Sequence, residues 1–435
     1  MQAGRLDHNA IGVDRKKNTQ PRRPQVYFVV LLAALSTSCS SIYNNIGGAF
    51  LGSPAEMEEA ISPGAKKLLR DAFNGIGPEG FVDYHVHMIS REVHADWLSW
   101  FHPIKRARTM IYLSAAGVDL NETVVQDYER RLLDLVHNAS GKGRYHLLAF
   151  DKNYGPDGEA NLDKTPLYVP NDYVMELSAR HPDIFVPVIS VHPYRADAIK
   201  ELERWARAGC RHIKWLPNVM GIDPASEQVE PFYRKVRDLD MILMSHTGDE
   251  RALDVDSQHF GNPLLLRKPL QMGIRVVALH SGSDGLGTDL DSPTQEQVPN
   301  LDLFLRMLEN PMYDGLLFGE ISAMVFHLHV DGPLLRILER EDLHHRFVNG
   351  SDYPVPGINA AIRTSTLAEA GLITDKERLH LNEIYSYNPL VFDFVVKRTL
   401  KHPETRQQLP LSMFRVPREL RRKQAAPQEG LSDDS

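Results

Sequence analysis

The sequence predicts an α/β protein with a (β/α)8 TIM barrel, and three observations support this fold class. Short β-rich runs alternate with helical runs along most of the 435 residues. The β-rich runs are almost continuously apolar, which is typical of parallel strands whose two faces are both covered by helices. Eight such units take roughly 250 residues, and often more with insertions, so the chain has room for one barrel with added segments.

Nine runs of the sequence have the composition of a β-strand, one more than the barrel needs. We exclude 109–114 (TMIYLS), because the units that follow it are spaced more evenly without it. The eight strands that we expect cover 81–87, 145–151, 183–192, 212–216, 241–246, 274–280, 315–321 and 347–352.

Helical runs stand between these strands. Asn171 or Asp172 can cap one of them, and Gly209 is a typical residue just after the last turn of another. The helices that we expect cover 122–136, 172–179, 196–208, 231–238, 264–272, 301–308, 333–340, 366–370 and 376–384.

The N-terminal region has the pattern of an export signal. Residues 15–23 are strongly basic, and the apolar run 26–35 is too short to span a bilayer, which takes about 20 residues. Ser36 to Cys39 resemble a bacterial lipoprotein cleavage box, although Ser36 stands where Leu is usual. We expect an exported, periplasmic or cell-envelope protein with a lipid anchor at Cys39. A buried helix or an uncleaved anchor is the alternative.

The chain therefore divides into four segments. Residues 1–39 are the export signal, 40–77 a tether with a leading helix, and 78–400 the barrel. Within the tether, 55–59 and 65–73 have helical composition. Residues 401–435 form a C-terminal extension that we expect to be partly disordered, from about Arg415, because it is charged and rich in Pro and Gly.

Composition excludes some classes of function. Hydrophobic residues make up 42% of the chain and charged residues 24%, as in ordinary soluble proteins. The net charge of −8 and the absence of a basic face argue against nucleic acid as a partner. Cys39 and Cys210 are too few for a cysteine zinc site, and we expect Cys210 to be a buried, inert thiol.

Metal-binding residue types stand at the ends of several expected strands. The first strand ends His85-Val86-His87, and side chains two apart in a strand point to the same side, so both imidazoles can meet one ion. His246, His280 and Asp352 close three later strands. Because barrel active sites lie at the C-terminal ends of the strands, this order of residues predicts a metal site there.

This set of residues resembles the metal site of the amidohydrolase superfamily. The resemblance rests on His85, His87, Lys214, His246, His280 and Asp352 in this order. The stretches HPDIFVPVISVHPYR, GCRHIKWLPN and NGSDYP resemble the amidohydrolase-related, or amidohydrolase-2, branch, over roughly residues 78–400. That branch contains lactonases, other hydrolases and nonoxidative decarboxylases.

The resemblance implies roles for these residues. His85, His87, His246 and Asp352 would hold one divalent metal ion, zinc by preference, or two. Asp352 would also move a proton, and His280 would polarise a carbonyl group, bind a second ion or support a ligand.

Lys214 is either a carboxylated lysine that bridges two metals or a residue that orients substrate or packs. We favour the substrate-facing lysine and one metal ion.

Four more residues are candidates for substrate binding. His192 closes a strand, and its position is compatible with a role in the site and equally with a buried core histidine. Glu320 ends the strand before the last and could touch substrate or a ligand histidine. Arg195 and Arg267 could hold a substrate carboxylate through paired hydrogen bonds, or form salt bridges within the fold. Trp215 and Tyr353 are further candidates for the pocket wall.

The expected function is hydrolysis of a lactone, ester or amide bond in a small substrate, which can carry a carboxylate, through a metal-activated water. Nonoxidative decarboxylation on the same scaffold is the alternative. Family decarboxylases often carry Glu at the position of His85, so this residue favours hydrolysis. A non-enzymatic surface lipoprotein is the third possibility, and the complete set of ligands argues against it.

Overall fold

Eight parallel strands form one sheet in the order β1-β2-β3-β4-β5-β6-β9-β10 in the computed structural model, which describes residues 46–77 and 79–421. The strands are β1 Phe81–His87, β2 Gly143–Leu148, β3 Phe185–Ile189, β4 His212–Trp215, β5 Ile242–His246, β6 Arg275–Leu279, β9 Leu317–Glu320 and β10 Phe347–Val348. Val86 and Tyr353 form a parallel bridge, and the amide of Tyr84 donates to the carbonyl of Asn349 at 2.9 Å. These contacts close the sheet, and the predicted (β/α)8 barrel is confirmed.

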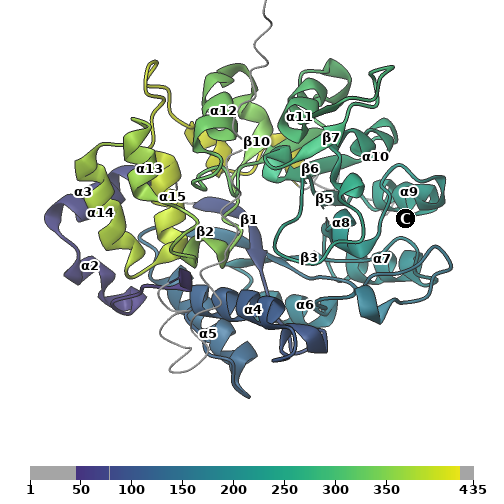
Figure 1. Ribbon diagram of the computed structural model, residues 1–435, viewed down its shortest axis with the longest axis horizontal. Coiled ribbons are helices and arrows are strands. Elements are labelled where there is room, and N and C mark those ends of the chain that lie inside the picture. Colours follow the sequence, from purple (N-terminus) through teal and green to yellow (C-terminus); the bar gives the residue numbers. More distant parts are fainter. Residues whose placement is uncertain (1–45, 78, 422–435) are drawn as a thin grey trace, which may run out of the picture. The chain divides into compact units, whose positions relative to one another are not determined.

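Helices surround the strands (Figure 1). Most of the longer ones have one buried and one exposed face, and most lie where the sequence predicts them. They are α2 Met57–Ala60, α3 Pro63–Phe73, α4 Pro103–Ala115, α5 Val124–His137, α6 Asn171–Arg180, α7 Ala198–Arg207, α8 Pro217–Met220, α9 Glu230–Asp238, α10 Arg267–Gln271, α11 Asn300–Leu308, α12 Leu335–Glu339, α13 Thr364–Glu369, α14 Asp375–Tyr385 and α15 Pro389–Thr399.

One helix, the end of one strand and a hairpin differ from the expected elements. Helix α15 was not expected, because it is buried on nearly all sides and so lacks a polar stripe. The strand expected at 347–352 ends at Val348, and Asp352 has a φ of 61°, outside the extended range. Strands β7 (Leu286–Thr288) and β8 (Gln297–Pro299) form a small antiparallel hairpin that was not expected. The excluded run 109–114 lies in α4, as its exclusion requires.

A register shift in β1 turns both of its histidines toward the barrel interior. The pairing of β1 with β2 shifts between Asp83 and Val86. Before the shift, Val82 and Tyr84 belong to a small apolar core together with Val188, Met244, Val277 and other strand residues. After the shift, His85 and His87 follow one another on the same side above that core. The larger apolar core, with Phe81 and Val86, packs between the strands and the helices.

The segments before and after the barrel pack against it. Helices α2 and α3 match the helical composition expected for the tether. Residues 415–421, which we expected to be disordered, include a short helical turn, and Leu420 is buried in the small core at the bottom of the barrel. The proposed export signal, Cys39 and residues 422–435 lie outside the described residues. Within 46–77 and 79–421, no helix is long and apolar enough to cross a membrane.

Candidate metal centre

His85, His87 and Asp352 converge at the C-terminal end of the barrel. The Nε2 atoms of the two histidines are 3.1 Å apart. Oδ1 of Asp352 lies 3.0 Å from Nε2 of His87 and 3.4 Å from Nε2 of His85. One ligand atom from each residue therefore falls within a space that a single cation can occupy. Two imidazole nitrogens and a carboxylate oxygen are a donor set that suits zinc and related divalent ions.

His246 lines the same cavity as His87 and Asp352 and would supply a third imidazole nitrogen. Its ring centre lies 4.8 Å from that of His280, which lies 4.9 Å from that of His85. Nε2 of His246 is buried and has no hydrogen-bond partner among the described residues. A buried polar atom without a partner is costly, and a bound metal ion would supply one. The residues present therefore fit a divalent metal.

Burial keeps the imidazoles of His85, His246 and His280 neutral, which is the form that binds a metal. Desolvation, together with the positive charge of Lys214, lowers the pKa of His246 to about 3. Desolvation also lowers the pKa values of His85 and His280 well below their usual range. Their lone pairs are available at neutral pH.

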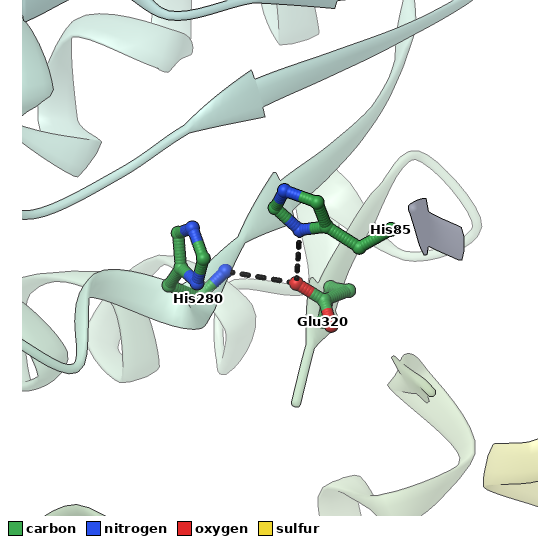
Figure 2. A group of neighbouring side chains, drawn as sticks. All are labelled: His85, His280 and Glu320. Atoms are coloured by element: carbon green, nitrogen blue, oxygen red, sulfur yellow. Dashed lines mark hydrogen bonds and ion pairs between the residues drawn. The ribbon is translucent and has the colours of Figure 1, made fainter. Parts of the chain in front are cut away.

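Glu320 orients His85 from behind (Figure 2). Its Oε2 lies 3.3 Å from Nδ1 of His85 and accepts a hydrogen bond from the backbone amide of His280 at 3.1 Å. The hydroxyl of Ser322 donates to the same oxygen at 2.7 Å and lies 2.8 Å from Nδ1 of His280. A carboxylate that accepts the Nδ1 proton leaves Nε2 free to face the metal position. Burial raises the pKa of Glu320 to about 7, while the Ser322 hydroxyl lowers it.

The backbone at His280 and Asp352 is held in an unusual conformation. Both residues have a φ of 61°, a left-handed value that is uncommon without glycine and costs about 1–3 kcal/mol. Buried hydrogen bonds support the second of these turns, because Asp83 accepts from the amides of His85 and Ser351, each at 2.9 Å. A Cβ at Gly350 would lie 2.1 Å from Oε1 of Glu320, so only glycine fits there.

A buried ion pair lies beneath the turn that carries Asp352. Nζ of Lys397 donates to Asp393 at 2.7 Å and to the carbonyl of Gly350 at 2.6 Å. Lys397 is fully buried, and it ties α15 to the residues just before Asp352. Burial raises the pKa of Asp393, and the neighbouring Lys397 lowers it.

Lys214 is buried on β4 and lines the cavity above the site, together with His87, His246, His280 and Asp352. Burial lowers the pKa of its ammonium to about 8, while the carboxylates of Asp352, Glu320 and Glu250 raise it. This position places the amine among the candidate ligands, where it can face a substrate.

Glu250 and Ser322 belong to the site but were not singled out from the sequence. Oε2 of Glu250 lies 3.9 Å from Nδ1 of His246, and its Oε1 accepts from the amide of Leu253 at 3.0 Å. Burial raises the pKa of Glu250. Both residues lie in irregular segments after strands, where hydrophobic periodicity gives no signal. The one feature of the sequence that could have pointed to them is that Glu250 follows His246, and Ser322 follows Glu320, by a few residues.

The other expected substrate-binding residues have partners elsewhere. Nε2 of the buried His192 lies 2.8 Å from the carbonyl of Met220. Arg195 pairs with Asp151 and Asp197, and Arg267 pairs with Asp291. The structure thus gives both arginines the salt bridges that were their alternative role. His192, Arg195, Arg267, Trp215 and Tyr353 are not among the residues that line the cavity.

Comparison with known proteins relates the chain to a protein family. A family model described as amidohydrolase matches residues 82–300. No curated protein sequence matches the chain significantly.

Several solved structures resemble the chain. An uncharacterised TIM-barrel protein of Bordetella bronchiseptica is 14% identical with a TM-score of 0.44, over 70% of this chain and 99% of the other. A putative 2-pyrone-4,6-dicarboxylic acid hydrolase of Pseudomonas putida is 17% identical with a TM-score of 0.38, over 63% and 82%. A manganese-bound 5-carboxyvanillate decarboxylase of Novosphingobium aromaticivorans is 13% identical with a TM-score of 0.41, over 72% and 96%.

Proposed function

Because the chain belongs to the amidohydrolase family and is an enzyme of that superfamily, we propose that it is a metal-dependent hydrolase of a lactone, ester or amide bond. The observation that carries this proposal is the convergence of His85, His87 and Asp352 beside the unpartnered Nε2 of His246. His85, His87, His246 and Asp352 would hold the ion, with zinc as the favoured metal. A bound divalent ion of this kind lowers the pKa of water and polarises a carbonyl group.

The protein residues around that position have complementary tasks. Asp352 contributes a carboxylate with one oxygen directed at His87, and it can take a proton from water and pass it to the leaving group. Lys214 lines the cavity, where its amine can donate a hydrogen bond to a substrate oxygen. His280 also lines the cavity, with its Nδ1 turned to the hydroxyl of Ser322. Glu320 keeps His85 in the tautomer that presents Nε2.

One ion fits this arrangement better than two. The second group of candidate ligands consists of His85, His280 and Glu320. Oε2 of Glu320 already accepts from the amide of His280 and from the hydroxyl of Ser322. These contacts support the use of Glu320 as an orienting carboxylate, and we propose a mononuclear site in which Lys214 faces the substrate.

A screen of purified, metal-loaded enzyme on lactones, esters and amides tests the reaction. We expect hydrolysis of at least one class that is lost in Asp352→Asn. Release of carbon dioxide from carboxylated aromatics without any hydrolysis would instead identify a decarboxylase. Absence of metal binding and of both activities would contradict the proposal.

We also propose that the protein is exported and anchored through a lipid on Cys39. The support is the basic segment, the short apolar run and the residues before Cys39 in the sequence. A Cys39→Ala variant should leave the membrane fraction or remain unprocessed. Wild-type protein that is soluble in the cytoplasm with an intact N-terminus would refute this proposal.

A further inference from the structure

The cavity above the candidate metal centre is large and has mainly apolar walls. Its volume is about 620 Å³, within the range of pockets that enclose a drug-sized ligand. The walls come from the segments after β1, β2, β4 and β5 and from α4 and α5. Their apolar side chains include Val93, Trp97, Leu120, Phe150, Leu167 and Leu253.

Hydrogen bonds between segments that are distant in the chain connect these walls. Val93 and Leu167 form an antiparallel bridge, which ties the segment after β1 to the segment after β2. The amide of His94 donates to the carbonyl of Pro166 at 3.0 Å beside it. The hydroxyl of Thr109 on α4 donates to the carbonyl of Trp97 at 2.9 Å. These contacts hold the segments that carry the apolar side chains in place around the cavity.

Charge in the cavity does not suit a substrate carboxylate. Among the described residues, Lys214 and Arg91 are the lysine and arginine side chains that line it. Lys214 lies among the metal-site residues, and Arg91 is exposed. Three carboxylates, Glu122, Glu250 and Asp352, line the same cavity. Apart from the exposed Arg91, no arginine lines the cavity among the described residues. A substrate carboxylate buried against the apolar walls, away from Arg91, would therefore lie unpaired, which is unfavourable.

We propose that the substrate is an ester, lactone or amide with an extended apolar body and no carboxylate on that body. This inference rests on the proposed hydrolase function, and it replaces the small carboxylated substrate that the sequence left open. The cleavable carbonyl group lies at the end of the cavity with Lys214, His280 and Asp352. The apolar acyl or alkyl group fills the space between the segments after β1 and β2.

Two measurements on the metal-loaded wild-type enzyme test this substrate class. The first is hydrolysis of p-nitrophenyl esters from acetate to octanoate, with p-nitrophenyl hydrogen glutarate compared against p-nitrophenyl pentanoate. The second is calorimetric binding of 1-alkanols from butanol to decanol, which the enzyme cannot hydrolyse. We expect kcat/KM and alkanol affinity to rise about threefold for each added methylene until the cavity is full. The uncharged pentanoate should be preferred over the glutarate.

A variant in the cavity wall and a matched surface control test whether the apolar group binds in this cavity. Leu120 lines the cavity and is 36% exposed, so Leu120→Gln should leave the fold intact. It should weaken octanoate turnover and decanol binding severalfold, and it should lower acetate turnover less than octanoate turnover. Leu379→Gln, at an exposed position on α14 outside the cavity, should change neither.

The outcomes separate this inference from the proposed function. Alkanol affinity that does not change with chain length, or a preference for the glutarate ester, would overturn the apolar substrate. Alkanol affinity that rises with chain length, without hydrolysis of any ester, lactone or amide, would support the apolar ligand and reject the hydrolase.

Discussion

Nε2 of His87 lies 3.0 Å from Oδ1 of Asp352, although His87 ends the first strand of the barrel and Asp352 follows the last. This contact lies where the barrel closes, because Val86 and Tyr353, the next residues to each, form the closing bridge. The ligand pair therefore depends on closure of the sheet, and the metal should in turn stabilise that closure. Addition of zinc to the metal-free protein should raise its Tm, and a Tm that does not respond would contradict this link.

Replacing Glu320 should weaken metal binding without removing a ligand. Glu320→Gln leaves a neutral group facing Nδ1 of His85, so the imidazole loses its negatively charged partner. We expect metal affinity to fall by about tenfold to a hundredfold, as measured by competition with a chelator. Glu309→Gln, at an exposed ion pair with Arg340, is the matched control and should not change affinity. An unchanged metal affinity in Glu320→Gln would show that Glu320 does not orient His85 for metal binding.

Replacing Lys214 should lower turnover and leave the metal in place. Lys214→Met keeps the length of a buried side chain but removes its donor to the substrate. We expect kcat to fall by about a hundredfold or more, with metal content unchanged by elemental analysis. Two ions per wild-type chain, falling to one or none in the variant, would instead identify Lys214 as a bridge between metals.

Breaking the buried ion pair beneath the Asp352 turn should destabilise the fold. Lys397→Met leaves Asp393 buried without its cation and removes the hydrogen bond to Gly350. The free energy of unfolding in urea should fall by about 3–5 kcal/mol. The double variant Lys397→Met, Asp393→Leu removes both charges and should recover much of this loss. A double variant as unstable as the single one would show that packing, and not the unpaired charge, sets the cost.

His192 should make stability fall on acidification. Burial lowers its pKa from 6.5 to about 4, so the unfolded chain binds a proton in this range and the folded protein does not. Its contribution is fully present above pH 6.5 and is lost as pH falls toward 4. From the shift, the loss at pH 5 is about 2 kcal/mol. His192→Gln should reduce the difference in unfolding free energy between pH 8 and pH 5 by this amount, and an unchanged difference would contradict the assignment.

Much of the fold and part of the site could be predicted from the sequence, because both follow from strand ends. The apolar strands are continuous in the chain, and His85, His87 and His246 stand at their last residues. Glu250 and Ser322 could not be predicted in this way, because irregular backbone brings them to the site. The register shift in β1 is likewise set by pairing with β2, which the sequence of β1 alone does not reveal.

The sequence left the roles of Arg195 and Arg267 open between substrate binding and salt bridges. A guanidinium group pairs with any carboxylate within reach, and both Arg195 and Arg267 find one within the fold. Helix α15 was hidden for a related reason, since its sides are all covered and leave no polar stripe. Both features depend on which segments pack together in the fold, and patterns in a single sequence do not show this.

The metal content of purified protein, measured by elemental analysis after growth with added zinc, tests the central claim most directly. The account predicts about one divalent ion per chain in the wild type and a strong loss in His87→Ala, with the fold retained by circular dichroism. Full metal occupancy in a His85→Ala, His87→Ala double variant, or a wild type that binds no divalent ion, would contradict it.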